Sequence, residues 1–439
     1  MMGRTLGRLG GVVKRGQFVF AVVLLFGAFL SAEAASIKSV QRGQATFASG
    51  QNTLPVTLTA VDPTRTIVWG GIDWGGGRIN SSNANSNRVG FQLSNATTLN
   101  LQRLGSPTQT TVVDWQAIEF NSGVSVQRRD TTFGIAEATV NIPISAVNLS
   151  ESFVLVSVAT GAGAQNADEE WTVRAHLTSS TNLELTRTQS GTAITVYWQV
   201  VTITGASVQR GLTSIGAGAS SAAAAITSVN TSTSFLLFTQ RAAAASNGVE
   251  SEYMVRGQIT APISLNFDRI STTNSVDIAW QVITLNDGSS VQAGSIALGT
   301  AASSGTATLS SVDLSRSTSF INVRGGSGTA AGNLDETALT HSLTAATTLS
   351  VFRGATGTAA DVGWFVVQFA GNAPPVLAAI GAKNTNENQL LQFRISATDP
   401  EAATPTLSAA NLPSGSTFVD SANGAGSFSW TPSFTQAGT

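Results

Sequence analysis

The strongest constraint on this chain is an internal repeat that occurs four times. Strand-like segments opening with the letters SVQ begin at Ser39, Ser125, Ser207 and Ser290. Each is followed by a closing segment that carries one tryptophan, and Trp115, Trp198, Trp280 and Trp364 are spaced by 83, 82 and 84 residues. A period this regular indicates that one folding unit was duplicated. Function should therefore lie either in what the copies share or where one copy departs from the others.

The composition favours β-structure without covalent crosslinks. Hydrophobic residues make up 42% of the chain and charged residues only 11%, and there is no cysteine. Disulfides and thiolate metal sites are thereby excluded, and each unit must be held by its own apolar core.

Inside each copy, short alternating runs are separated by turn residues every 8 to 12 positions, which predicts strands and hairpins. We expect an all-β protein of tandem antiparallel β-sandwich domains with six or seven strands each. The recurrent tryptophans are interpreted as core residues, and Arg103, Arg187, Arg269 and Arg353 as braces of a sheet end. The short junctions predict either a stiff rod or a closed ring, with neighbours that share a sheet edge. The predicted repeats are 36–123, 124–206, 207–289 and 290–371.

The first residues have the pattern of a secretory signal peptide. Arg4, Arg8, Lys14 and Arg15 precede a 13-residue apolar run, Phe18 to Leu30, and Ala32-Glu33-Ala34 offers a cleavage site. The run is shorter than the roughly 20 residues that span a bilayer. We therefore expect residues 1–34 to be removed and the mature chain to be extracellular or at the cell surface, with no stable membrane span.

A different module follows the Pro-Pro linker at 372–375. Residues 376–439 contain "ATDPE", "LPSG" and "FSWTP" in the order and spacing that resemble the immunoglobulin-like, cadherin-like modules (He-PIG type) of bacterial surface proteins. The resemblance implies an immunoglobulin-like β-sandwich. Family members continue with further strands, so the resemblance also implies a truncated module in a fragment of a longer protein.

The same resemblance implies the only metal site that we predict. Glu387, Asp399 and Glu401 match positions at which cadherin-like modules bind calcium, and Asp420 is a further candidate. The usual DPDGD motif is incomplete, because Glu401 and Ala402 stand in place of its second half. No other cofactor is expected.

The first repeat carries the best candidate ligand site. Trp69, Asp73, Trp74 and Arg78 lie in a Gly/Asn-rich stretch unique to this copy, and aromatic faces beside polar side chains are typical of glycan sites. The alternative is that Trp69 merely continues a strand. Each repeat also has a faint similarity to H-type lectins, as in Val113 to Ile118, which implies a sandwich fold but transfers no sugar-binding residue.

No catalytic motif is evident in the sequence. The two histidines, His176 and His341, occupy adjacent but non-equivalent repeat positions, and no basic patch invites nucleic acid. We predict a non-enzymatic, exported adhesion or binding protein whose partner is a surface or matrix glycan or protein. The alternatives are a structural spacer or stalk and, more remotely, an accessory region of a carbohydrate-active enzyme. The oligomeric state is left open.

Overall fold

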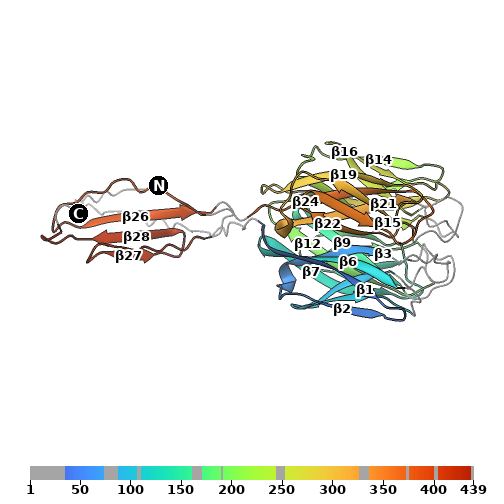
Figure 1. Ribbon diagram of the computed structural model, residues 1–439, viewed down its shortest axis with the longest axis horizontal. Helices are drawn as coiled ribbons and strands as arrows, with labels where there is room; N and C mark the ends of the chain where they lie inside the picture. Colours follow the sequence, from blue (N-terminus) through green and yellow to red (C-terminus); the bar gives the residue numbers. More distant parts are fainter. Residues whose placement is uncertain are drawn as a thin grey trace, which may run out of the picture. The chain divides into compact units, whose positions relative to one another are not determined.

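The computed structural model describes residues 35–73, 88–105, 110–160, 171–188, 191–243, 253–325, 336–371, 375–399 and 404–436. The fold is all-β, as predicted, and consists of antiparallel sheets (Figure 1). Within the described residues no helix is long and apolar enough to cross a membrane.

Each repeat is a sandwich of two three-stranded sheets. The first sheet joins the first, sixth and third strands of the repeat, and the second sheet joins its second, fifth and fourth strands. The strands of the first two repeats are β1 (Ser36–Phe47), β2 (Thr53–Thr57), β3 (Thr66–Asp73), β4 (Gly90–Asn95), β5 (Thr98–Gln102), β6 (Thr111–Ser122), β7 (Val124–Phe133), β8 (Thr139–Pro143), β9 (Ser152–Thr160), β10 (Arg174–Ser179), β11 (Asn182–Thr186) and β12 (Ile194–Ile203).

The last two repeats follow the same order. Their strands are β13 (Ser207–Ile215), β14 (Ser221–Ala225), β15 (Ser234–Ala242), β16 (Arg256–Ala261), β17 (Ser264–Asp268), β18 (Val276–Thr284), β19 (Ser290–Leu298), β20 (Ser304–Thr308), β21 (Ser317–Gly325), β22 (Thr340–Ala345), β23 (Thr348–Phe352) and β24 (Ala360–Gln368). Before the third strand, the 3-10 turns η1 (Pro63–Arg65), η3 (Leu149–Glu151) and η6 (Leu314–Arg316) begin at an Asp or Asn that accepts a backbone N–H, a normal capping arrangement.

The core of each sandwich lies between its two sheets. In the first repeat Phe47, Leu99, Leu101 and Val113 are fully buried and pack together, because strand alternation turns these side chains to the same inner side. The closing tryptophans belong to the same cores. Trp115 covers Gly43 of the opening strand, where an added Cβ would lie 2.7 Å from a ring carbon, so a larger residue there would displace the ring.

The recurrent arginines are buried clamps. In every repeat the guanidinium donates to backbone carbonyls of the turn between the first and second strands. In the fourth repeat, for example, Arg353 Nε lies 2.8 Å from Ala302 O and Nη2 lies 2.7 Å from Gly299 O. Arg103, Arg187 and Arg269 make the corresponding contacts. The prediction that these residues brace a sheet end is confirmed.

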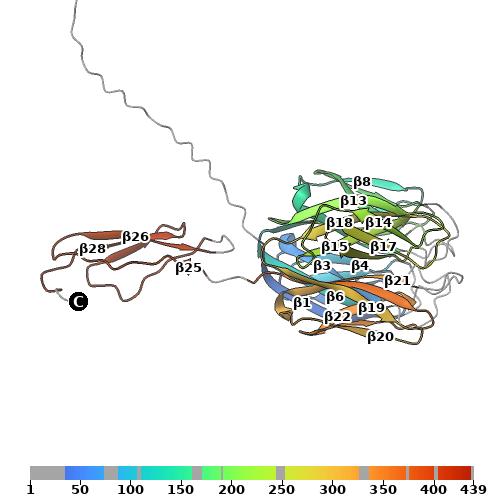
Figure 2. The ribbon, with the colours of Figure 1, turned by 90° about the horizontal axis from the view of Figure 1, so that it is seen from above.

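The four repeats close into a ring. The fourth strand of each repeat packs on the third and sixth strands of the next one, and β22 of the last repeat packs on β3 and β6 of the first. Figures 1 and 2 show the orange β22 beside the blue strands of the first repeat. Strands on either side of each junction belong to different sheets, so the expectation that neighbours share a sheet edge is wrong. Short junctions between repeats would allow a shared sheet edge, but the repeats are joined by side-chain contacts between separate sheets.

Equivalent hydrogen bonds fasten three of the four interfaces. Gln199 of the second repeat exchanges two hydrogen bonds with the backbone of Val68 in the first, and Gln281 does the same with Val154. Gln116 completes the set between the first and fourth repeats, where it contacts Thr318 and Ser319. The opening strands add Arg42, Arg128 and Arg210, each of which donates to the preceding repeat at the 3-10 turn and the start of its third strand.

The interface between the third and fourth repeats departs from this pattern. Ala293 and Phe365 occupy the places of the arginine and the glutamine, and they line a cavity of about 120 Å³. Arg324 instead forms an ion pair across the interface with Asp268 at 2.9 Å. At this seam an ion pair and the hydrogen bonds of Asn322 with Gly257 stand in place of the glutamine and arginine contacts of the other three.

Residues 376–436 form the separate C-terminal module. Its strands β25 (Val376–Leu377), β26 (Leu391–Thr398), β28 (Ala425–Trp430) and β27 (Thr417–Asp420) make one antiparallel sheet in that order. Phe393 and Phe428 pack together with ring centroids 5.0 Å apart. Leu390, Val419 and Phe434 remain largely exposed.

Candidate functional site

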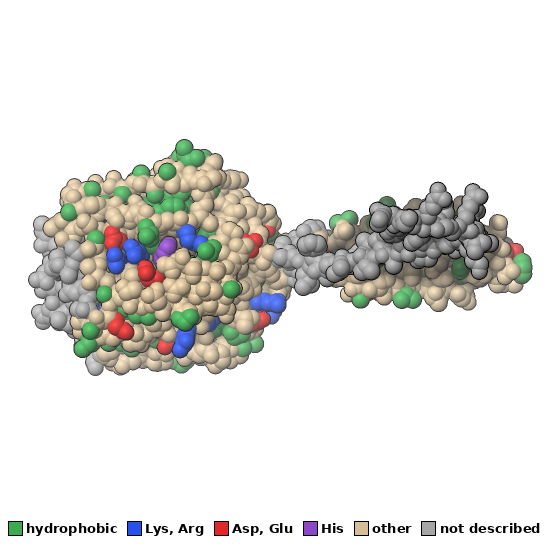
Figure 3. Space-filling view, turned by 180° about the vertical axis from the view of Figure 1, so that it is seen from behind, with side chains coloured by type: hydrophobic (Ala, Val, Ile, Leu, Met, Phe, Trp, Pro, Cys, Tyr) green, Lys and Arg blue, Asp and Glu red, His purple; other side chains and the backbone are tan. Residues whose placement is uncertain are grey.

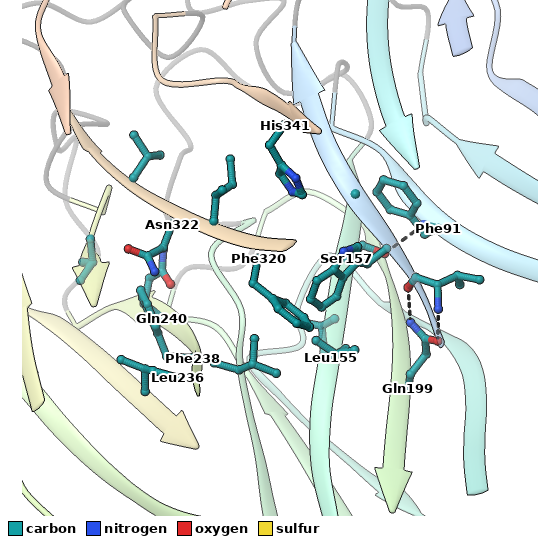
Figure 4. A pocket seen from close by; sticks show the side chains of 18 of the residues that line it. Phe91, Leu155, Ser157, Gln199, Leu236, Phe238, Gln240, Phe320, Asn322 and His341 are labelled. Carbon is teal, nitrogen blue, oxygen red and sulfur yellow. Dashed lines mark hydrogen bonds between the residues drawn. The ribbon is translucent and has the colours of Figure 1, made fainter. Parts of the chain in front are cut away.

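A pocket opens where the third strands of all four repeats meet. Its volume is about 340 Å³, within the range of about 300 to 1,000 Å³ that is usual for small-molecule sites. The walls come from β3, β9, β15 and β21 and from the flanking strands β4 and β22 (Figure 4). We call it the axial pocket, because no single repeat could form it.

The apolar walls differ from copy to copy. Trp69, Leu155, Leu237 and Phe320 occupy one equivalent position of the third strand, as the pairing with the closing strands shows. Trp69 packs edge-on against Phe320, and Phe320 stacks on Phe235 with ring centroids 5.1 Å apart. These rings join a hydrophobic core shared by all four repeats. The pocket is thus an aromatic-lined opening above a solid axial core.

Two of the amide side chains around the pocket bind the backbone of a neighbouring repeat. Asn322 accepts a hydrogen bond from Gly257 N at 3.0 Å and donates to Gly257 O at 3.2 Å. Gln199 pairs in the same way with Val68. Both side chains therefore fasten neighbouring repeats, each with one accepted and one donated hydrogen bond.

A buried cluster of polar side chains lies at the edge of this pocket, between the first and fourth repeats. The carboxylate of Asp114 accepts the backbone N–H groups of Gly71 and His341, at 2.5 and 3.1 Å. Nδ1 of His341 lies 3.5 Å from Asp114 Oδ2 and 3.2 Å from the hydroxyl of Ser319. Burial raises the pKa of the Asp114 carboxyl, although His341 and the two N–H groups act in the opposite direction.

This cluster is not a catalytic triad. In a triad the nucleophile and the carboxylate contact opposite nitrogens of the imidazole, so that the ring can relay a proton. Here Ser319 and Asp114 both approach Nδ1, and Ser319 is completely buried. The arrangement orients the imidazole without activating a nucleophile.

Of the predicted ligand residues of the first repeat, Trp69 and Asp73 are described. Trp69 lies on β3 and lines the axial pocket, but its Nε1 is enclosed without a hydrogen-bond partner among the described residues. Asp73 ends the same strand and accepts Gly354 N of the fourth repeat at 2.8 Å, so it helps to close the ring. Trp74 and Arg78 lie outside the described residues.

The predicted calcium residues of the C-terminal module are only partly described. Asp420 accepts the backbone N–H groups of Leu407 and Ala422, and Glu401 lies outside the described residues. Glu387 and Asp399 are described, but no group of three acidic or histidine side chains suited to a metal is found in the described part of the chain.

Sequence reasoning missed Asp114 and His341, although the repeats held a signal. His341 stands where the other copies have Phe91, Ala175 and Gly257, and Asp114 stands where they have Tyr197, Ala279 and Gly363. Both are single-copy departures at apolar or small positions. The two lie 227 residues apart in the chain, and only the closed ring brings them together.

Several charged groups elsewhere on the ring form ion pairs. Arg174 pairs with Glu184 and Arg241 with Asp277. Figure 3 shows acidic and basic side chains gathered near the middle of one face, with a few others toward its edge. Comparison with protein-family models found no match, and comparisons with curated proteins and with solved structures found none either.

Proposed function

We propose that this is an exported, non-enzymatic binding protein of the adhesin type whose ring presents one ligand site, the axial pocket. The observation that carries this proposal is the divergence of the four copies at the pocket wall. Residues that only hold the ring together, such as the glutamines and arginines at the interfaces, are repeated at three of the four interfaces. At the equivalent wall position, Leu155 and Leu237 are the same in two copies, whereas the first and fourth repeats place the aromatic residues Trp69 and Phe320 there. A ring used only as a stalk would gain nothing from aromatic residues at this position in only two of its four copies.

Export is the second element of the proposal and rests on the leader-like residues 1–34. The partner that we propose is a component of a cell surface or matrix, presented outside the cell. The C-terminal module would then join the ring to whatever carries it, and calcium remains a proposed ligand of that module alone.

A thermal-shift screen tests the binding proposal. Soluble glycans and single-ring aromatic compounds are added to the mature chain and to two variants, Trp69→Ala and Leu155→Phe, which respectively enlarge and fill the pocket. A ligand that binds only the native state raises the melting temperature. We expect at least one compound class to stabilise the native chain and to lose its effect in both variants. Trp430→Ala, in the C-terminal module, is the matched control and should respond like the native chain.

If no compound of either class shifts the native chain, the binding proposal fails and the stalk alternative is favoured. If a compound shifts the native chain and both pocket variants equally, its site lies elsewhere.

A further inference from the structure

The ligand class of the axial pocket can be narrowed from the hydrogen bonds that the pocket still has to offer; this inference rests on the proposed function. The side-chain amides of Gln199 and Asn322 each accept one backbone N–H and donate to the carbonyl of the same neighbouring residue. Gln240 uses its Nε2 on Tyr253 O at 3.0 Å, and the Ser157 oxygen accepts Phe91 N at 2.9 Å. Three groups of the lining make no hydrogen bond to another described residue: Nε2 of His341, the Gln240 carbonyl and the hydroxyl proton of Ser157. The indole N–H of Trp69 is also without a partner but is enclosed, and the amides of Gln199, Asn322 and Gln240 each keep a second N–H.

His341 is the most strongly oriented of these three groups. Only 3% of His341 is exposed. The residue borders both the axial pocket and the neighbouring cavity at Asp114. Figure 4 shows the ring pointing from its strand toward the space near Phe320 and Ser157. The Asp114 carboxylate beside Nδ1 favours the tautomer that carries its proton there, which leaves Nε2 as a hydrogen-bond acceptor.

A sugar suits this pocket poorly. A monosaccharide brings several hydroxyl groups, and each one buried without a partner costs roughly 1 to 3 kcal/mol. The walls supplied by Phe91, Leu155, Phe238 and Phe320 offer no further polar partners. A ligand with an apolar ring and one hydroxyl group needs only one polar partner, which His341 supplies.

We propose that the axial pocket binds a phenol, whose ring packs among these apolar side chains while its hydroxyl donates to Nε2 of His341. The size is suitable, because an apolar cavity of about 150 Å³ already holds benzene and this pocket is larger, at about 340 Å³. The phenol can come from a free small molecule or from a tyrosine side chain of a partner protein. Both present the same chemistry to the pocket.

Calorimetric titration of the mature chain with p-cresol and with toluene tests the hydroxyl contact. We expect p-cresol to bind about 10-fold more tightly than toluene, as one good buried hydrogen bond would give. His341→Phe should reduce that ratio to about one while toluene still binds. The fold should tolerate this change, because Phe91 occupies the equivalent position of the first repeat. His176→Gln, which alters the other histidine of the chain outside the pocket, is the control and should keep the ratio.

Equal binding of p-cresol and toluene, or a ratio that survives His341→Phe, would overturn the inference. N-acetyltyrosinamide separates the two sources: binding as tight as that of p-cresol supports a protein-borne tyrosine, and binding of p-cresol alone supports a free phenol. Methyl glucoside binding that is lost in Trp69→Ala would refute the phenol and leave the proposed function standing. If none of these probes binds, and the glycan and aromatic screen also shows no shift, both proposals fail.

Discussion

Asp114 is unusual for an acidic residue because its side chain is buried. Its carboxyl is buried between the first and fourth repeats, and burial raises its pKa. Asp313 is its opposite: exposed at the start of η6, it has its pKa lowered by hydrogen bonds from the side chain and backbone of Ser315. The two carboxyls should therefore affect stability with opposite dependence on pH.

For Asp114 the unfolded chain loses the proton near pH about 3.9, whereas the native chain keeps it to higher pH. The free energy of unfolding therefore falls as the pH rises from the unfolded pKa to the folded one. The Asp114→Asn variant should not show this pH-dependent fall in the free energy of unfolding. A change in stability that is the same at every pH does not affect this comparison.

For Asp313 the native chain loses its proton at lower pH than the unfolded chain does. The free energy of unfolding therefore rises as the pH rises from the folded pKa to the unfolded one, and Asp313→Asn should not show that rise. Urea denaturation from pH 3 to pH 8 measures both effects, and a native-minus-Asp114→Asn difference that is independent of pH would contradict the assignment.

At the scale of single elements, the turn after each opening strand depends on one side chain. The guanidinium of Arg353 donates to Ala302, Gly299 and Thr358 carbonyls, and its own side chain is almost completely buried. Such a clamp satisfies backbone acceptors that water cannot reach. Because the arginine binds backbone carbonyls, it holds the turn without depending on the side chains of the loop.

Arg353→Met should therefore lower the free energy of unfolding by about 3 kcal/mol or more, because several buried carbonyls lose their donor at once. Arg65→Met is the matched control. Arg65 is half exposed and its ion pair with Asp62 is a surface one, so a change of at most about 1 kcal/mol is expected. Chemical denaturation of the mature chain measures both. Similar losses in the two variants would show that the buried clamp is not special.

At the scale of the whole molecule, the closed ring makes each repeat depend on both neighbours. The face of β3 and β6 is covered by β22 from the far end of the array, and the aromatic residues of the axial core come from different repeats. In an open rod, loss of the last repeat would leave the others as they were. In a ring, the same loss uncovers two apolar faces.

We predict that the three-repeat chain 36–289 melts at a lower temperature than the ring 36–371 and self-associates through its two uncovered faces. Thermal denaturation followed by circular dichroism, together with size-exclusion chromatography, measures both properties. A three-repeat chain that stays monomeric and melts at the temperature of the ring would show that closure contributes little.

Much of the fold could be predicted because it depends on local patterns that recur. Alternating apolar residues predict the strands, and the packing of the recurrent tryptophans against the cores and the burial of the recurrent arginines follow from their presence at equivalent positions in every copy. Even the alanine run at Ala222 to Ala225, which has high helix propensity, is strand β14, as its brevity and β-branched flanks indicate. Of the candidate ligand residues that the structure describes, Trp69 lines the axial pocket and Asp73 does not.

The sequence by itself determined an antiparallel sandwich of six or seven strands and its fourfold repetition, because strand periodicity and core burial act within one unit; the structure has six strands in each repeat. Only the tertiary structure decided that the array is a ring, since that choice depends on whether β22 meets β3 and β6 across the whole length of the repeats. The same long-range contact brings Asp114 and His341 together and aligns four different third strands around one pocket. Aligning the four repeats shows which positions differ between copies. That these positions lie together around one pocket follows only from packing between residues far apart in the chain.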